Sequence, residues 1–216
     1  MKTEKAILVL NGQGFWGRGF LTALEEKPGF VIAVDGGIGH LEGFSVRPVI
    51  HIGDMDSSAP DSKVPVTDTV IFPADKDRSD FFLALDFVNK KNVNDVLIFA
   101  ASGGRSDHFI SNYETAVDFA SRGMKITFSG EEEDIFFLPC IAPEGYEFKF
   151  PAGSTVSVFA GTDECLGVTL EGFKYGLKNE VLSKNIPLGL SNLAAGESQR
   201  INFENGVIVV IFNKNS

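Results

Sequence analysis

The chain has 216 residues, of which 44% are hydrophobic and 22% charged, so it is long enough for one large domain or two modest ones with a buried core. This composition excludes a largely disordered chain. The formal net charge of −10 argues against general binding to nucleic acid, because phosphate backbones attract an excess of Lys and Arg.

Cysteine use and the N-terminal segment favour a soluble cytoplasmic protein. Cys140 and Cys165 are too few for a disulfide framework and lack the spacing of zinc ligands. The apolar run at residues 6–10 is far shorter than the core of a signal peptide or a membrane span. We therefore expect no membrane partner.

In residues 1–138, short apolar runs alternate with segments of helical character. Phe81, Leu85 and Val88 share one face of a predicted helix, and a second predicted helix over 110–120 stops at Gly123. The runs are nearly continuous in apolar residues, as in strands covered on both faces, and lie at 6–10, 31–34, 49–52, 70–72, 96–99 and 126–128. Strands alternating with helices predict a doubly wound, mainly parallel α/β sheet.

Residues 139–216 have a different pattern and predict a small antiparallel β domain. Apolar and polar residues alternate within 154–159 and over 201–204. Asn205-Gly206 then offers a two-residue hairpin turn before the apolar run 207–212. Because a domain of this size has only a modest core, we expect it to pack on the first domain or on a second copy of the chain.

Glycines and charged residues gather directly after several of the predicted strands. These clusters lie at 35–37, 53–57, 73–80 and 102–108. In an open α/β sheet the carboxyl ends of parallel strands share one edge, and ligands bind in the crevice there. The clusters therefore predict one shared site.

The acidic residues of these clusters suggest a cation. Asp35, Asp54, Asp56 and Asp80 would bring carboxylates into a small volume, where they repel each other unless a cation lies between them. Hard oxygen ligands of this kind suit Mg²⁺, which commonly binds a few carboxylates together with substrate phosphates.

The glycines and basic residues of the same clusters suggest phosphate. Glycines such as Gly36, Gly37 and Gly104 let backbone N–H groups approach a phosphate closely. Lys76 and Arg105 supply positive charge for phosphate oxygens. Together the clusters describe a Mg²⁺–nucleotide site for phosphoryl or diphosphoryl transfer.

Each signal taken alone favours a plainer interpretation. A lone Asp54-x-Asp56 pair more often marks a solvated turn than a metal site. His40 and His51 lie beside apolar runs and are more typical of hydrogen-bonded structural residues, whereas His108 gains weight from its place after a strand. Gly12-x-Gly14 is only part of a dinucleotide fingerprint, so a nicotinamide site is disfavoured.

Taken in order, the clusters resemble the motifs of the thiamine pyrophosphokinase family. The matching strings are VDGG (34–37), GDMDS (53–57), DKDRSD (75–80), GGRSDH (103–108), GFKYGLKNEVLS (172–183) and LGLSN (188–192). The resemblance implies an α/β nucleotide domain, residues 1–138, followed by a β-sandwich for thiamine binding and dimerisation, residues 139–216. It also implies a homodimer whose active sites lie in clefts between the subunits.

The reaction that the resemblance implies is the transfer of the β,γ-diphosphate of ATP to thiamine, giving thiamine diphosphate and AMP. By motif, Asp54, Asp56 and Asp80 would hold Mg²⁺, with Asp35 beside them. The residues that would face the nucleotide are Gly36, Gly37, Lys76, Gly104, Arg105, Asp107 and His108, the last two without an assigned role.

The motifs place the thiamine site in the second domain. Tyr175 would stack on the pyrimidine ring, because an aromatic face suits an electron-poor, partly cationic ring. Ser191 and Asn192 would hydrogen-bond the aminopyrimidine edge. Two residues depart from the family pattern: Ser79 stands where Thr is frequent, and Leu193 stands where an acidic residue is common.

Two other functions fit the same residues. Another Mg²⁺-dependent nucleotide enzyme, such as a sugar transferase with an Asp-x-Asp pair, would bind nucleotide sugars and release no AMP. A catalytically silent module that senses thiamine or a nucleotide would gain stability from its ligand without turnover.

Overall fold

The computed structural model describes residues 4–46, 49–53, 64–71 and 77–215. The contacts divide the chain into two compact units, residues 1–115 with 128–131 and residues 116–127 with 132–216. The domain boundary at residue 138 stays a prediction. Among the described residues, no helix combines the length and apolar character needed to cross a membrane.

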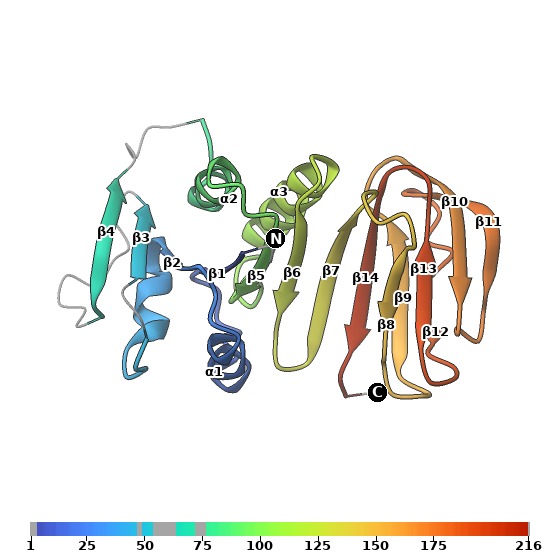
Figure 1. Ribbon diagram of the computed structural model, residues 1–216, viewed down its shortest axis with the longest axis horizontal. Coiled ribbons are helices and arrows are strands. Elements are labelled where there is room, and N and C mark those ends of the chain that lie inside the picture. The colour runs from blue at the N-terminus through green and yellow to red at the C-terminus, as the bar shows by residue number, and fades with distance from the viewer. Residues whose placement is uncertain (1–3, 47–48, 54–63, 72–76, 216) are drawn as a thin grey trace. The chain divides into compact units, whose positions relative to one another are not determined.

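The first unit is built on a parallel sheet (Figure 1). β1 (Lys5–Val9) pairs with β2 (Phe30–Val34) on one side and with β5 (Asp95–Phe99) on the other. β3 (Val49–Gly53) pairs with β2, and β4 (Val66–Ile71) pairs with β3. All these pairs are parallel, and the strand order is β5-β1-β2-β3-β4. The mainly parallel α/β sheet of the sequence analysis is confirmed.

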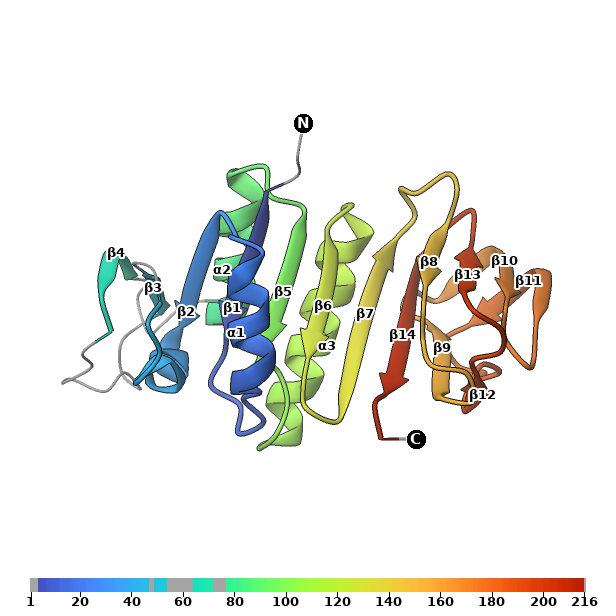
Figure 2. The same ribbon diagram turned by 60° about the horizontal axis from the view of Figure 1, so that its bottom comes forward.

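Both faces of the sheet are buried along β1 and β2, which explains why these strands are apolar at successive positions. Side chains alternate between the two faces of a strand. Ile7 and Val9 of β1 pack in one core cluster with Phe20 and Ala23 of α1 (Gly17–Glu25). On the other face lies α2 (Asp80–Lys90), with its buried residues Phe81, Ala84, Leu85 and Val88 (Figures 1 and 2).

The remaining elements of the α/β part connect these strands. A 3₁₀ segment, η1 (Asp35–Leu41), follows β2 directly. α3 (Ser106–Ser121) follows β5 and precedes β6 (Lys125–Ser129). Both predicted helices are confirmed, and Gly123, at φ +96°, lies just beyond the end of α3.

β4 differs most from its predicted form. The apolar run indicated a strand over 70–72, whereas β4 begins at Val66. Most of its side chains are exposed, because β4 is the edge strand of the sheet. An edge strand with an open face accepts polar residues such as Thr67 and Asp68, which the search for apolar runs passes over.

The second unit contains two antiparallel arrangements of strands. In one, β14 (Val207–Asn213) lies between β7 (Glu133–Pro139) and β9 (Thr155–Ala160), and β9 also pairs with the two-residue β12 (Asn192–Leu193). In the other, β10 (Glu164–Glu171) lies between its neighbours in the order β11-β10-β13-β8, with bounds Leu177–Ser183 for β11, Gln199–Asn202 for β13 and Tyr146–Phe148 for β8.

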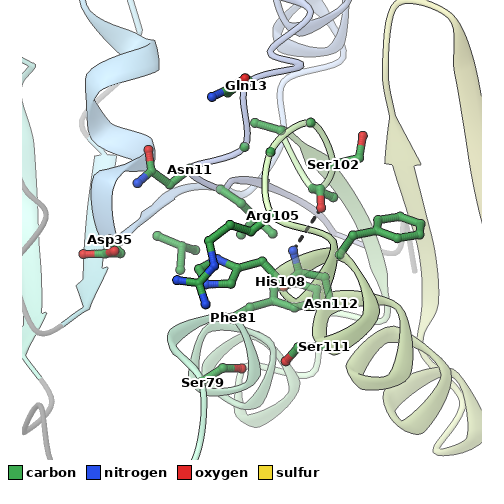
Figure 3. Close-up of a pocket in the computed structure, with 18 of the residues that line it drawn as sticks. Asn11, Gln13, Asp35, Ser79, Phe81, Ser102, Arg105, His108, Ser111 and Asn112 are labelled. Carbon is green, nitrogen blue, oxygen red and sulfur yellow. Dashed lines mark hydrogen bonds between the residues drawn. The ribbon is translucent and has the colours of Figure 1, made fainter.

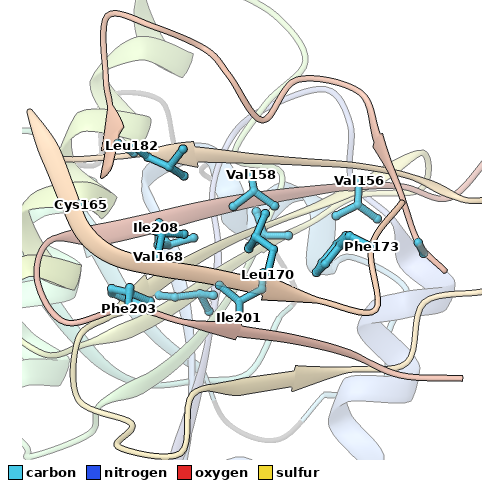
Figure 4. Packing of buried hydrophobic residues seen from close by; sticks show 14 of the residues in the cluster. Val156, Val158, Cys165, Val168, Leu170, Phe173, Leu182, Ile201, Phe203 and Ile208 are labelled. Atoms are coloured by element: carbon cyan, nitrogen blue, oxygen red, sulfur yellow. The ribbon is translucent and has the colours of Figure 1, made fainter. Parts of the chain in front are cut away.

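A shared core joins these two arrangements as a sandwich (Figure 4). Val158 and Ile208 from the first, and Val168, Leu170 and Ile201 from the second, belong to one cluster of buried side chains. Each such side chain contributes about 1.5–3 kcal/mol when it is fully buried. The predicted antiparallel β domain is therefore confirmed as a sandwich.

The predicted hairpin at Asn205-Gly206 is wrong. β13 pairs with β8 and β10, whereas β14 pairs with β7 and β9, so this turn joins the two sheets rather than two neighbouring strands. Between them, Glu204 N donates to Leu166 O at 2.9 Å and Asn205 forms a β-bridge with Leu166. The chain therefore runs beside Leu166 as it passes from one sheet to the other. The dipeptide Asn205-Gly206 alone does not predict this crossing.

Candidate active site

The strand order places a ligand crevice beside β1. The chain passes from β1 through β2 and β3 to β4, and β5 then returns to the opposite side of β1. In such sheets, ligands bind outside the carboxyl ends of the strands where the order reverses. A cavity of about 470 Å³ lies at this position (Figure 3).

The cavity collects residues from several strand ends and helix starts. Of the residues predicted from the sequence, Asp35, Asp80, Gly104, Arg105 and His108 line it. In Figure 3 the side chains of Asn11 and Asp35 lie across the cavity from Arg105 and His108. Sequence reasoning missed several polar lining residues, Asn11, Gln13, Ser111 and Asn112, whereas Ser102 belongs to the predicted cluster 102–108. Asn11 and Gln13 directly follow an apolar run, a signal that could have found them.

Close backbone contacts fix the wall beside β1. Gly12 N donates to Ala100 O at 2.9 Å, and Gln13 N donates to Gly103 O at 2.6 Å. A Cβ atom on Gly12 would lie 2.1 Å from Ser102 O, so only glycine fits between the two loops. The loops after β1 and β5 thus form one joined wall.

Asp35 occupies a strained position at the end of β2. Its φ of +49° lies in the left-handed region, which L-residues rarely adopt. Its backbone carbonyl accepts a 2.9 Å hydrogen bond from Nε2 of the buried His51. Its carboxylate Oδ1 is buried and has no hydrogen-bond partner among the described residues. A cation or a hydrogen-bond donor would satisfy a buried acceptor of this kind.

Asp80 enters the cavity from the first turn of α2. The preceding residue, Ser79, caps the helix, because its Oγ accepts a 3.2 Å hydrogen bond from Phe82 N. The positive end of the helix dipole stabilises a carboxylate at this place. The Ser that replaces the family's frequent Thr therefore keeps the capping hydroxyl.

Arg105 and Asp107 form a two-point ion pair at the start of α3. Arg105 Nε donates to Asp107 Oδ1 at 3.1 Å, a second guanidinium nitrogen donates to Oδ2, and His108 N donates to Oδ1 at 2.9 Å. The hydrogen bond from Arg105 lowers the pKa of Asp107, and the same contact raises the pKa of Arg105. Asp107 thus orients the guanidinium that lines the cavity.

Of the remaining residues predicted for the nucleotide site, the structure describes Gly36 and Gly37. Gly36 and Gly37 belong to η1, and a Cβ atom on Gly37 would lie 2.1 Å from Val9 O. Gly37 thus allows η1 to pack against the end of β1. Asp54, Asp56 and Lys76 lie outside the described residues.

The cavity has the donor chemistry of a hard-cation site. No group of at least three potential metal-ligating side chains occurs within the described part of the chain, from which Asp54 and Asp56 are absent. The carboxylates of Asp35 and Asp80 both belong to this cavity, and the buried Oδ1 of Asp35 has no partner in the segments that the structure describes. Carboxylate oxygens of this kind fit Mg²⁺.

A second, smaller cavity of about 210 Å³ lies in the β-sandwich unit. Tyr175 and Asn192 line it together with apolar residues that include Leu170, Leu188 and Leu190. Tyr175 is 60% exposed, whereas Asn192 is 3% exposed. Ser191 is exposed, and its backbone N donates to Ser157 Oγ at 3.0 Å. Two of the three predicted thiamine-site residues thus line one cavity, and the third is adjacent in sequence.

Comparison with known proteins identifies the family. Residues 21–128 match the family model described as Thiamin pyrophosphokinase, catalytic domain, and residues 144–208 match the one described as Thiamin pyrophosphokinase, vitamin B1 binding domain. The chain belongs to the thiamine pyrophosphokinase family. Membership makes it a thiamine diphosphokinase, an enzyme with ATP and thiamine as substrates. The sugar transferase and the silent sensor are not favoured.

Individual relatives share both sequence and fold. The thiamine pyrophosphokinase of Bacillus subtilis (strain 168) is 26% identical over 196 residues, which cover 88% of this chain and 90% of the relative. The solved thiamin pyrophosphokinase of Geobacillus thermodenitrificans is 26% identical, with a TM-score of 0.76 and 98% of each chain covered. That of Candida albicans, at 16% identity, has a TM-score of 0.77 over 99% of this chain and 90% of its own, which shows the shared fold.

Proposed function

We propose that ATP binds in the cavity at the strand ends, thiamine binds at the Tyr175 cavity, and the β,γ-diphosphate passes from ATP to the thiamine hydroxyl. One observation carries the assignment of the nucleotide site. Asp35, whose buried Oδ1 has no partner in the described part of the chain, the helix-start Asp80 and the ion-paired Arg105 meet in one cavity at the reversal of strand order. This combination suits a cation-bound polyphosphate.

Charge determines what the residues would do. Asp54, Asp56 and Asp80 would hold Mg²⁺ with Asp35 beside them, and the ion would supply positive charge between carboxylates and phosphates. Arg105 would donate to phosphate oxygens, and backbone N–H groups at the start of α3 favour an anion there. Lys76, Gly104 and His108 complete the predicted nucleotide contacts.

The chemical step is a displacement at the β-phosphorus. The hydroxyethyl oxygen of thiamine bonds to this phosphorus, the bond to the α-phosphate oxygen breaks, and AMP leaves. The hydroxyl proton passes to a carboxylate, for which Asp80 and Asp35 are the two candidates. The reaction requires the hydroxyl and the β-phosphorus to be held in line.

One assay tests the activity. Purified protein is incubated with ATP, Mg²⁺ and thiamine, and AMP and thiamine diphosphate are both quantified. We expect the two products in equal amounts. ADP would indicate transfer of a single phosphoryl group. Stabilisation by thiamine without any product would indicate a sensor, and nucleotide-sugar binding without AMP would indicate a sugar transferase.

Carboxylate variants test the site. We expect Asp80→Asn, Asp54→Ala and Asp56→Ala each to lower kcat by at least about a hundredfold, as the loss of a group that organises charge in a transition state does. The control is Asp68→Asn, at an exposed position of β4, which should keep wild-type activity. Wild-type turnover of an Asp80, Asp54 or Asp56 variant at saturating Mg²⁺ would remove that residue from the site.

We further propose a homodimer with active sites in clefts between the subunits. Large apolar side chains are exposed near the Tyr175 cavity: Ile186 is 65% exposed, Leu188 63% and Leu190 62%. A second copy of the chain would cover them. Sedimentation that finds a stable, active monomer would overturn this proposal. The cytoplasm stays the predicted location, which the two free cysteines support.

A further inference from the structure

The side-chain amide of Asn192 forms hydrogen bonds with the backbone of Tyr175. Its Nδ2 donates to Tyr175 O at 2.7 Å, and its Oδ1 accepts from Tyr175 N at 3.0 Å. Oδ1 also accepts from Leu193 N at 2.9 Å. A carboxamide oxygen has two acceptor sites, so both are filled, and the side chain itself is only 3% exposed.

The segment that carries Tyr175 is held mainly through its backbone. On the way from β10 to β11, Lys174 N donates to Leu193 O at 2.9 Å and Phe173 forms a β-bridge with Ala194. The Asn192 amide adds hydrogen bonds to the next residue, Tyr175, as the backbone of a neighbouring strand would. Tyr175 is 60% exposed, so packing supplies little of its order, and Lys174 Nζ lies over its ring at 5.3 Å from the centroid. The two hydrogen bonds between the Asn192 amide and the Tyr175 backbone therefore fix the backbone from which the ring projects.

We propose that Asn192 is a positioning residue, which holds Tyr175 as one wall of the thiamine cavity and does not itself accept a hydrogen bond from the amino group of the aminopyrimidine. The inference rests on the proposed placement of thiamine at this cavity. It replaces the direct contact that the sequence motif suggested. Among side chains of this length at position 192, only a carboxamide can both donate to Tyr175 O and accept from Tyr175 N. An aspartate would turn a negative oxygen toward the Tyr175 carbonyl and lose the donor.

The experiment pairs Asn192 variants with two substrates. Steady-state constants are measured for wild type, Asn192→Asp and Asn192→Ala with thiamine and with the analogue whose pyrimidine amino group is replaced by hydroxyl. For thiamine we expect KM to rise by about tenfold, the effect of losing one or two buried hydrogen bonds, while the KM for ATP stays unchanged. The factor should be equal for the two substrates, because no contact to the amino group is lost.

The control makes the same chemical change elsewhere. The Oδ1 of Asn202 accepts from the next backbone nitrogen, Phe203 N, at 3.0 Å, as Asn192 does with Leu193, but Asn202 is exposed. We expect Asn202→Asp to leave every constant unchanged. In a Tyr175→Ala background, Asn192→Asp should add no further loss, because its effect acts through Tyr175. Circular dichroism confirms that each variant is folded.

The outcomes separate this inference from the proposed function. A penalty that vanishes with the hydroxyl analogue would show a direct contact to the amino group and overturn the inference. A full penalty of Asn192→Asp in the Tyr175→Ala background would overturn it as well. Wild-type protein that makes no thiamine diphosphate would instead contradict the proposed function, before any variant is compared.

Discussion

The imidazole of His51 donates a hydrogen bond from Nε2 to the backbone carbonyl of Asp35 at 2.9 Å. His51 is buried in β3, and Asp35 begins η1 with φ +49°. A carbonyl is only an acceptor, so this nitrogen carries the proton. Gly53 adds room on the same side, because its Cβ atom would lie 3.0 Å from Asp35 Cα. One strand thus supports the strained turn that presents Asp35 to the cavity.

Replacing His51 by Leu should destabilise the fold. The carbonyl of Asp35 would lose its partner, so we expect the free energy of unfolding to fall by about 1–3 kcal/mol. Urea unfolding followed by circular dichroism measures this change. His51→Gln is the matched variant, because its amide can still donate, and it should lose less. Equal stability of His51→Leu and wild type would show that the hydrogen bond contributes nothing.

The sequence was sufficient to predict a shared site at the carboxyl ends of the strands. Buried strands are recognisable as apolar runs, and polar residues at their carboxyl ends must share one edge of a parallel sheet. This reasoning placed Asp35, Asp80 and Arg105 together, and the structure brings them into one cavity. The same reasoning applies to Asn11, which follows the apolar run 6–10. Gly12-x-Gly14 there instead suggests part of a dinucleotide fingerprint.

Other features depend on contacts that no local pattern encodes. The turn at Asn205-Gly206 has hairpin chemistry, yet pairing with Leu166 directs the chain into the other sheet. Glycines at 17 and 19 weaken the helical pattern of α1 in the sequence, whereas Gly19 makes room for the Trp16 ring, 2.0 Å from where its Cβ would lie. The partners of the Asn192 amide follow from the same kind of tertiary contact.

Gly37 and Gly39 of η1 form a matched pair for testing backbone crowding. A Cβ atom on Gly37 would lie 2.1 Å from Val9 O, whereas one on Gly39 would meet nothing within 4 Å. We expect Gly37→Ala to lower the free energy of unfolding by about 1–3 kcal/mol or more, because backbone must move, and Gly39→Ala to keep wild-type stability. Thermal and urea unfolding measure both. Equal tolerance at the two positions would contradict this packing of η1 against β1.

Ser79 tests the cap of the helix that carries Asp80. Its Oγ accepts from Phe82 N at 3.2 Å, so we expect Ser79→Ala to lower the free energy of unfolding by about 1 kcal/mol and Ser79→Thr to be nearly neutral. Fraying of the first turn also moves Asp80, so the alanine variant should lose kcat as well. Denaturant unfolding and steady-state kinetics check the two effects. An alanine variant with unchanged stability would show that water replaces the cap.

Arg105 can be tested through the titration of Asp107. The hydrogen bond from Arg105 holds the pKa of the Asp107 carboxyl below its ordinary value of 3.8. Arg105→Ala removes this contact, so we expect that pKa to rise, as followed by NMR of the carboxyl carbon. Arg105→Lys keeps the charge but not the two-point geometry and should give an intermediate value. An unchanged pKa in Arg105→Ala would mean that the pair does not persist in solution.

The same pair gives a pH dependence of stability with a definite sign. A carboxyl whose pKa is lowered by folding contributes stability above its unfolded pKa and loses it as the pH falls through the folded value. The stability difference between wild type and Arg105→Ala should therefore shrink as the pH falls below about 3.8, the ordinary pKa of the group. It should be small throughout, because both side chains are exposed.

Arg105→Ala should also raise the KM for ATP by about tenfold at neutral pH, because a charge-assisted hydrogen bond to phosphate is lost. A stability loss without any change in KM would assign Arg105 to the fold rather than to the nucleotide.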